Sequence, residues 1–283
     1  MSVTDADLAT LTASHDIITL GMQADDVRRR MHGTRTTFVR VADVTAAPGD
    51  PVHVPPAAGE VRIVGMPASL AAAVGRVAEV RAAIGARPLS GFSLSDLEQV
   101  SILERETLRT LLEDLCAAGL ELVAEAPFER LQDPRRSLEQ VNIAGLALAR
   151  LGVERLPDTD IVPLLKQVAQ VQRSVGFIRA FAPLPRRVNP AVPTTGYDDV
   201  KRVALARIVV DNIPSIQVDW SLYGPKLAQV ALTMGVDDID CVSADDDLSE
   251  GRRRAPLEEI QRNIRAAGLD PVERNGRFEL IAR

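Results

Sequence analysis

The sequence predicts an α/β protein whose single domain, spanning residues 1–283, folds as a (β/α) barrel, either closed or partly open. Strand-like runs alternate along the chain with helix-like segments of about ten or more residues, which forces parallel pairing through βαβ crossovers. No glycine-rich nucleotide fingerprint follows the first strand, as a doubly wound dinucleotide fold would require. The chain length and about six to eight expected strands therefore favour a barrel.

In the first half of the chain, apolar residues near helical spacing indicate an opening helix that ends at Gly33. The expected strands are residues 36–44, 61–65, 88–94 and 120–124. The expected helices are residues 70–85, 104–118 and 134–151, the last of which we expect Gly152 to end. Residues 45–59 are rich in Pro, Gly and Ala and are predicted to form a loop.

The second half continues the alternation. The expected helices are residues 159–174, 197–211, 225–234 and 256–267, and the expected strands are residues 176–182, 215–220 and 238–242. Two short terminal strands flank Asn275-Gly276, a strong turn signal that predicts a C-terminal β-hairpin.

Composition excludes several function classes. The formal net charge of −6 and an aromatic content of 3% argue against nucleic-acid binding, which needs a clustered basic surface and, for single strands, stacking platforms. The two cysteines, Cys116 and Cys241, lie far apart and have no His or Cys neighbour at metal-ligand spacing, so we expect no metal site. The sequence contains no long apolar run and no signal-peptide pattern, and we therefore expect a cytoplasmic protein that does not bind membranes.

One C-terminal stretch resembles a known family. Residues 203–214, VALARIVVDNIP, continue to Trp220 and to the GPKLAQ segment at 224–229, and together they resemble the radical S-adenosylmethionine enzymes of the futalosine route to menaquinone. Within that family, aminofutalosine synthase and dehypoxanthine futalosine cyclase look most similar. The likeness extends to further segments at residues 30–33, 59–65, 181–184 and 235–240. The resemblance implies a barrel of the radical S-adenosylmethionine type and a link to menaquinone biosynthesis.

The motifs that carry the family's chemistry are missing. The resemblance implies a CxxxCxxC loop after the first strand, but residues 44–59 contain no cysteine. A [4Fe-4S] cluster with one open iron needs those three thiolates, so we expect no cluster. Side chains also replace glycines where the cofactor should approach, in Gly65-Met66-Pro67 and in residues 123–127, which disfavours binding of S-adenosylmethionine. The family's His-x-Glu-Thr segment is absent as well.

Alternation along the strands selects the residues that face the barrel lumen. Since Ile216, Val218 and Trp220 suit the helix layer, the intervening residues should point inward. The candidate binding residues are Arg62, Glu125, Arg179, Gln217, Asp219 and Ser221. We expect Arg179 and Asp219 to meet, because consecutive strands of a barrel are neighbours.

This charged lumen has two interpretations. The charges form either a salt-bridged plug in a former cofactor cavity or a pocket in which arginine forks hold a small anionic molecule. Asp237, Asp238 and Asp240 lack the pattern of a calcium loop and are interpreted as solvated loop acids.

Two functions follow from the resemblance and its missing motifs. The first is a non-catalytic, accessory relative that binds a small anionic metabolite or an intact enzyme of the pathway. The second is an enzyme of altered, non-radical chemistry that acts on a carboxylate-bearing intermediate of the same pathway.

Overall fold

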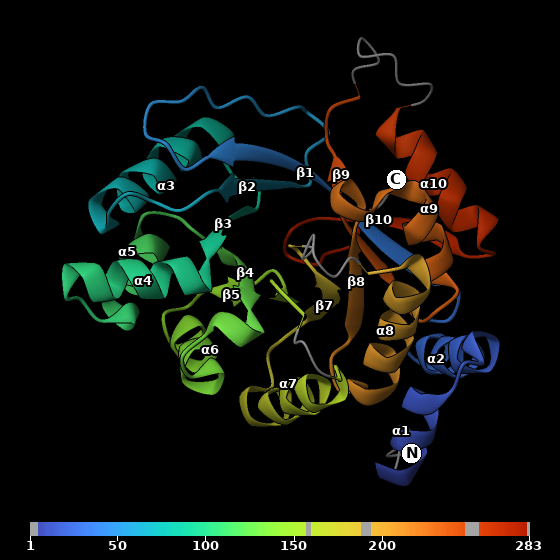
Figure 1. The fold of residues 1–283 in the computed structure, drawn as a ribbon. Helices are drawn as coiled ribbons and strands as arrows, with labels where there is room; N and C mark the ends of the chain where they lie inside the picture. Colours follow the sequence, from blue (N-terminus) through green and yellow to red (C-terminus); the bar gives the residue numbers. More distant parts are fainter. Residues whose placement is uncertain (1–4, 157–159, 188–193, 247–254, 282–283) are drawn as a thin grey trace.

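The computed structural model describes residues 5–156, 160–187, 194–246 and 255–281. Its centre is a closed ring of parallel strands, with helices arranged around the outside (Figure 1). The ring consists of β1 (Arg35–Thr45), β2 (Glu60–Val64), β3 (Leu89–Ser93), β4 (Leu122–Pro127), β6 (Leu151–Val153), β7 (Ala180–Pro185), β8 (Ser215–Asp219) and β9 (Asp238–Ser243). Because β1 pairs with both β2 and β9, the eight strands of the ring close on themselves.

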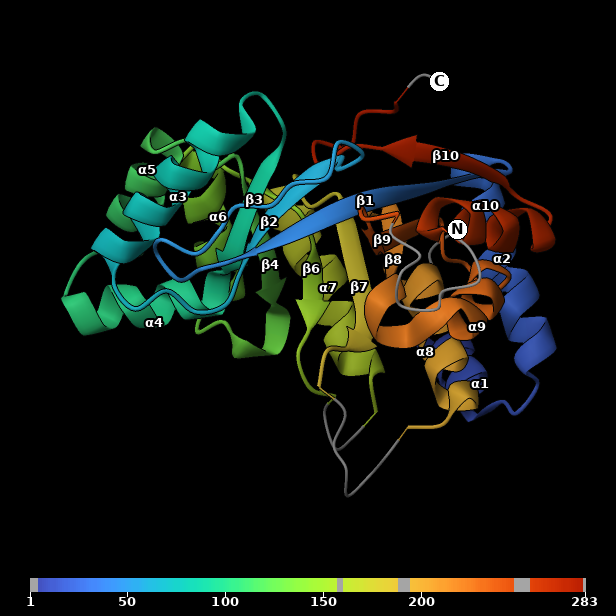
Figure 2. The same ribbon diagram turned by 90° about the horizontal axis from the view of Figure 1, so that it is seen from above.

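Two further strands pair with the outside of this ring. β5 (Ala147–Leu148) pairs with β4, and β10 (Asp270–Arg274) runs parallel to β1, as Figure 2 shows. The predicted hairpin is reduced to a turn after Arg274, closed by a single antiparallel bridge between Arg274 and Leu280. This turn folds back beneath the barrel instead of extending a sheet.

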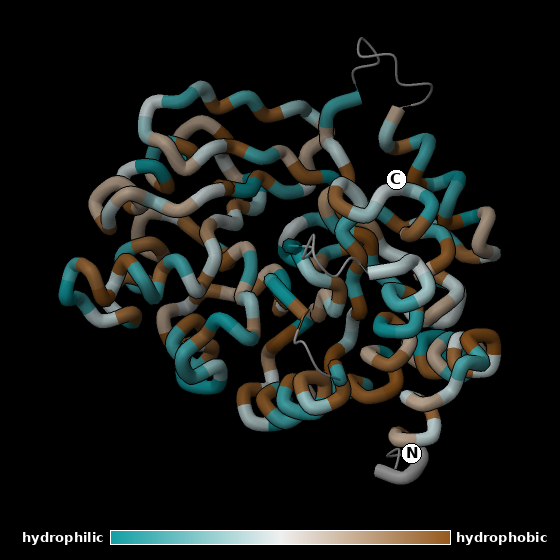
Figure 3. The backbone as a smooth tube through the Cα atoms, in the orientation of Figure 1, coloured by the Kyte–Doolittle hydropathy of each residue, from teal (hydrophilic) through white to brown (hydrophobic). Residues whose placement is uncertain are grey.

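The helix layer contains α3 (Leu70–Ile84), α4 (Leu94–Glu104), α5 (Leu108–Ala117), α6 (Pro134–Ile143), α7 (Val162–Val175), α8 (Gly196–Val209), α9 (Trp220–Leu232) and α10 (Pro256–Ala266), after α1 (Asp5–Ala13) and α2 (Ile17–His32). Hydrophilic residues gather on the outer turns of peripheral helices such as α10 and α6 (Figure 3). None of the helices in the described segments combines the length and the apolar character that a bilayer crossing requires.

Several predicted elements differ from the structure, and two differences concern the helix layer. The sequence analysis missed α4, which begins directly after β3 at Leu94, so the predicted helix 104–118 corresponds to α5 alone. The predicted helix 134–151 ends early, because Gly145 adopts a φ of 83° that continues no helix. The residues that follow are thereby released to form β5 and β6.

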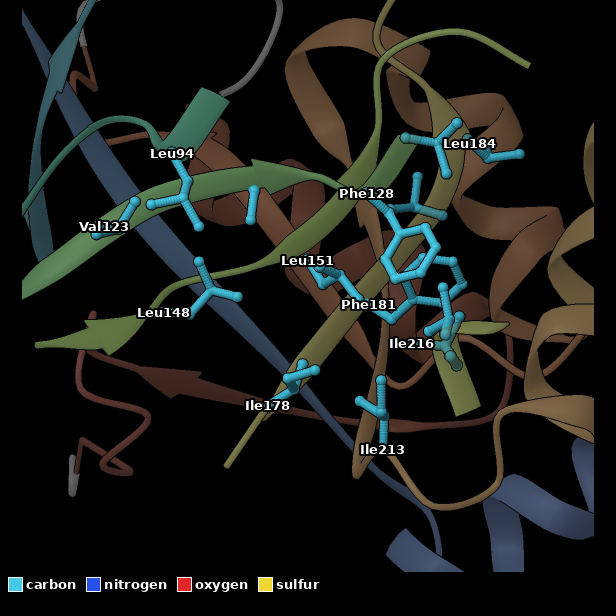
Figure 4. Packing of buried hydrophobic residues seen from close by; sticks show 14 of the residues in the cluster. Leu94, Val123, Phe128, Leu148, Leu151, Ile178, Phe181, Leu184, Ile213 and Ile216 are labelled. Atoms are coloured by element: carbon cyan, nitrogen blue, oxygen red, sulfur yellow. The ribbon is translucent and has the colours of Figure 1, made fainter. Parts of the chain in front are cut away.

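The core lies between the strands and the helices. Figure 4 shows Leu94, Leu148, Phe181 and Ile216 within one cluster of buried hydrophobic side chains, and each of them is at most 2% exposed. Burying a side chain of this size contributes about 1.5–3 kcal/mol to the stability of the folded state. The buried side chains connect the elements from β3 to β8. The apolar layer therefore fixes the strands on which the charged lumen residues stand.

Candidate functional site

A β-bulge in β9 shapes the lumen. Phe38 pairs with Ile239, but Arg40 pairs with Val242, so β9 carries one extra residue opposite β1. Cys241 occupies this bulge with a φ of 58°, a left-handed conformation that is uncommon for a side chain other than glycine. As a result, two consecutive residues of β9, Asp240 and Cys241, both contact the guanidinium of Arg62.

Arg62 on β2 is fully engaged. Its Nη2 lies 2.7 Å from Glu60 Oε1 and 3.1 Å from Asp240 Oδ1, and its Nη1 donates to Cys241 Sγ at 2.9 Å. The side chain is only 4% exposed. A buried charge of this kind is tolerated because every contact is a partner of opposite charge or an acceptor.

Arg150, immediately before β6, joins the remaining acids. Its Nη1 lies 2.8 Å from Asp240 Oδ2 and 3.3 Å from Asp219 Oδ2, while its Nη2 lies 3.0 Å from Glu125 Oε2. Arg186, after β7, contacts the same Glu125 and Asp219 at 3.1 and 3.2 Å from a more exposed position. We call this set the lumen network: Glu60, Arg62, Glu125, Arg150, Arg186, Asp219 and Asp240.

The lumen network has more acids than bases, because four carboxylates face three guanidiniums. Burial by itself would raise the pKa of Asp240, but Arg62, Arg150 and Arg274 outweigh burial and hold this pKa well below its usual range. Burial, reinforced by Asp240, instead holds the pKa of the Cys241 thiol well above its usual range despite Arg62 and Arg150. Cys241 is therefore a protonated thiol near neutral pH and a poor nucleophile or metal ligand.

A cavity of about 310 Å³ opens above the network at the carboxyl ends of β1, β8 and β9. We call it the mouth; its lining includes Asp43, His53, Ser221, Cys241, Ser243 and Asp245. The carboxylate of Asp43 makes no hydrogen bond with the described residues. Its surroundings raise the pKa of Asp43, chiefly through desolvation and with Asp240 and Glu60 adding to the effect, although Arg62 and Arg150 oppose it.

The connection between β1 and β2 borders this mouth. Residues 46–59, all of which the structure describes, form no helix. Arg76 of α3 holds the start of the connection, donating from Nε to Thr45 O at 2.9 Å and from Nη1 to Asp50 O at 3.0 Å. The connection offers no thiolate, and in the described part of the chain no group of three or more His, Cys, Asp or Glu residues is arranged to hold a metal. The donor set at this end of the barrel therefore does not match an iron–sulfur cluster ligated by three cysteines.

Five of the six predicted site residues lie along the lumen. Arg62, Glu125 and Asp219 belong to the lumen network, and Ser221 donates to Asp219 Oδ1 at 2.8 Å. Gln217 lies one inward position before Asp219 on β8 and donates to Asp238 Oδ2 at 2.6 Å. Arg62, Gln217 and Asp219 thus lie on β2 and β8 at the inward positions that strand alternation predicted, whereas Ser221 belongs to α9, and the role of all five residues in binding stays a prediction.

The predicted pairing of Arg179 with Asp219 is wrong. β7 begins at Ala180, so Arg179 precedes the strand and lies at the amino end of the barrel. Its Nη1 donates to Arg277 O at 2.8 Å, whereas Asp219 is held by Arg150 and Arg186. The error arose from extending the strand back to Gly176, which placed Arg179 at an inward position it does not occupy.

Sequence reasoning also missed the centre of the network. Arg150 fell inside a predicted helix that the structure ends at Ile143. Asp238 and Asp240 were interpreted as solvated acids, which is wrong, because both are inward residues of β9 and are 0% and 2% exposed. The signal was present, since Asp238, Ile239 and Asp240 show the same alternation as Gln217, Val218 and Asp219.

Comparison with known proteins supports the resemblance. Residues 181–282 match the CofH/MqnC C-terminal region. Aminodeoxyfutalosine synthase of Streptomyces coelicolor is 30% identical over 169 residues, which cover 58% of this chain and 41% of that protein. Cyclic dehypoxanthine futalosine synthase of the same organism is 24% identical over 210 residues, covering 65% and 53%. The matched segments thus span about half or less of these relatives.

The fold is also found among solved structures. Methylornithine synthase superposes with a TM-score of 0.69 at 13% identity, covering 96% of this chain and 94% of that one. At this level of identity the likeness establishes the barrel architecture alone.

Proposed function

We propose that this chain is a cluster-free relative of the radical S-adenosylmethionine enzymes of the menaquinone pathway, and that it works by binding and performs no radical chemistry. The observation that carries this proposal is the lumen network, in which the arginines and acids beneath the mouth neutralise one another. Its role would be that of an accessory protein for a small molecule or for an intact enzyme of the menaquinone pathway, acting in the cytoplasm without contact to nucleic acid or membrane.

The missing ligands support the absence of a cluster. Three thiolates would have to come from a chain with two cysteines, and the loop after β1 contains neither of them. Cys241 faces the lumen, but its thiol is protonated and its sulfur accepts a hydrogen bond from Arg62. For the same reasons we derive no reaction step through iron, sulfide or S-adenosylmethionine.

Of the two interpretations of the lumen, the geometry favours the plug. The terminal nitrogens of Arg62 and Arg150 already donate to carboxylates and to Cys241, so neither arginine offers a pair of terminal donors to an incoming anion. The network carries one more acid than base, and Asp43 and Asp245 add carboxylates at the mouth. An anionic ligand would therefore meet an unfavourable potential there.

A second candidate, an enzyme of altered and non-radical chemistry, is supported by the mouth itself. Asp43, His53 and Ser221 line one cavity, and the raised pKa of Asp43 is a feature that proton-transfer groups often show. Loss of turnover of a carboxylate-bearing pathway intermediate in Asp43→Asn, with Asp245→Asn as the matched control, would favour this candidate over the binding protein.

Anaerobic reconstitution with iron and sulfide tests the main proposal. The intact aminodeoxyfutalosine synthase of Streptomyces coelicolor serves as a positive control. We expect this chain to bind no stoichiometric iron and to show no reducible visible absorption, and Cys241→Ser should leave any residual iron unchanged. About four iron atoms per chain with a reducible signal would overturn the proposal.

A further inference from the structure

A second cavity, of about 620 Å³, lies at the opposite end of the barrel from the mouth. We call it the floor pocket; its lining includes Arg81, Cys116, Glu121, Arg179, Arg277 and Phe278. Glu121 directly precedes β4 and Arg179 directly precedes β7, so the pocket opens at the amino ends of the strands. The C-terminal turn contributes Arg277 and Phe278 as one wall.

The charge balance of the floor pocket is the reverse of that in the lumen. Three arginines face a single carboxylate, that of Glu121. Arg81 Nη2 lies 2.7 Å from Glu121 Oε1, and Arg277 Nε lies 2.5 Å from Oε2. Burial would raise the pKa of Glu121, but its hydrogen bonds to Arg277 and Arg81 prevail and lower it. The remaining positive charge has no carboxylate in the pocket to neutralise it.

Arg179 is positioned but not saturated. Its Nη1 donates to Arg277 O at 2.8 Å, and its guanidinium lies 5.4 Å from the centre of the Phe278 ring. Arg274 contacts the same ring at 4.1 Å, so Phe278 is held between two guanidiniums. Nε and Nη2 of Arg179, and Nη1 of Arg277, make no hydrogen bonds with the described residues. These donors are available to an oxyanion.

The rest of the pocket is apolar. Leu120, Leu122 and Leu148 line it together with the ring of Phe278. Arg81 cannot serve the ligand, because its donors are occupied by Gly119 O, Gly85 O and Arg87 O as well as by Glu121. The pocket thus combines a wall suited to a hydrocarbon or aromatic body with a small set of free guanidinium donors at one side.

We propose that the floor pocket binds a small carboxylate carried on an apolar or aromatic body, and that Arg179 is its anion contact. The planar guanidinium matches a carboxylate through paired N–H donors, and the apolar lining favours an organic carboxylate over inorganic phosphate. The floor pocket lies away from the mouth, so this proposal does not depend on whether the chain carries a cluster. It assigns a role to Arg179, which does not face the lumen.

Isothermal titration calorimetry of the full chain with benzoate tests this site. Benzamide, a neutral analogue, and inorganic phosphate serve as comparison ligands. We expect benzoate to bind at least about tenfold more tightly than either, because hydrogen bonds to a charged group are worth about 1.5–3 kcal/mol. Equal affinity for benzamide, tighter binding of phosphate, or no benzoate binding would overturn the proposal.

Two arginine variants locate the contact. Arg179→Ala removes an exposed side chain and should weaken benzoate binding by about tenfold or more without loss of folding. Arg173→Ala is the matched control, since Arg173 is also exposed, hydrogen-bonds only to Gln170 among the described residues, and lies outside the pocket lining. Unchanged affinity in Arg179→Ala, or an equal loss in both variants, would show that Arg179 is not the anion contact.

Discussion

The two ends of this barrel use arginine in different ways. In the lumen network Arg62 and Arg150 are nearly buried, and the arginines of the network meet an excess of carboxylates. At the floor pocket the arginines outnumber the single Glu121, and Arg179 at the surface has donors that make no hydrogen bond with the described residues. The comparison teaches that the count of arginines does not identify an anion site, whereas the balance of donors and acceptors around each one does.

The difference follows from where each residue stands on its strand. Inward positions on β2, β8 and β9 face the interior of a closed ring, where Arg62 contacts Asp240 and Arg150 joins Asp240 to Asp219. Arg179 precedes β7 and therefore lies outside the closed ring. The carboxyl ends of the strands therefore hold a network of paired charges, while an excess of arginine lies at the amino ends.

The largest expected effect concerns the buried arginine of the plug. Arg150→Met should lower the free energy of unfolding by about 3–5 kcal/mol, because it leaves buried acids uncompensated. Arg186→Met is a matched control that removes contacts to the same Glu125 and Asp219 from a side chain that is 37% exposed, against 4% for Arg150. Its cost should stay within about 1 kcal/mol. Equal losses in urea unfolding would refute the buried-plug description.

A smaller effect is expected beneath the floor pocket. Gly119 has a φ of 106°, and an added Cβ would lie 2.9 Å from Arg81 Cγ. Gly119→Ala should therefore lower the free energy of unfolding by about 1–3 kcal/mol through backbone strain and displacement of Arg81. Gly176→Ala, at a φ of 73° with nothing within 4 Å, reports the strain alone. If the two variants lose the same stability in thermal unfolding, the packing of Arg81 is not tight.

The two cysteines should differ in reactivity by about tenfold or more. Cys241 is held as a thiol by burial and by Asp240, so it should react slowly with iodoacetamide at pH 8. Cys116 lines the floor pocket and should react first, and benzoate should slow that reaction. Peptide mass spectrometry over time distinguishes the sites. Faster labelling of Cys241, or no protection of Cys116, would contradict the assignment of the two ends.

The smallest effects are those of pH, and they have opposite signs at the two ends. The lowered pKa of Glu121 gives stability that is present above about pH 4.5 and is lost as pH falls through the folded-state pKa. The raised pKa of Asp43 gives stability that is present below about pH 3.8 and is lost as pH rises through its folded-state pKa.

Two substitutions check these signs. At pH 7, Glu121→Gln should therefore lower the free energy of unfolding, and Asp43→Asn should raise it slightly, because solvent at the mouth screens the charge of Asp43. Both differences should shrink toward low pH. Urea unfolding from pH 3 to pH 7 measures them, and equal signs for the two variants at pH 7 would contradict the charge balance described for the mouth and the floor.

Much of the fold was predictable because alternation of strands and helices is a property of the sequence itself. The order of the ring, from β1 to β9, follows from that alternation and from short crossovers. What the sequence could not show was where elements end without a loop, as at the junction of β3 and α4, where Leu94 begins the helix at once. The pairing of β1 with β9, which closes the barrel, is also a long-range contact that no local sequence pattern shows.

The site was predictable only in part for a related reason. Inward positions such as Arg62 and Asp219 were found by their period of two along recognised strands. Arg150 was missed because the strand that it precedes, β6, is three residues long, which is too short for a period of two to be recognised. The contribution of Cys241 depends on a bulge, which adds one residue to β9 and has no marker such as glycine or proline at that position.

Urea unfolding with and without saturating benzoate tests the contrast between the two ends most directly, applied to the unmodified chain, Arg150→Met and Arg179→Ala. We predict that Arg150→Met loses most of its stability without ligand yet keeps the stabilisation by benzoate, since binding to the folded state adds to its free energy. Arg179→Ala should show the reverse, with near-normal stability and no gain from benzoate. A gain from benzoate that survives in Arg179→Ala, or a loss of stability there as large as in Arg150→Met, would contradict the division of the barrel into a structural plug and a binding floor.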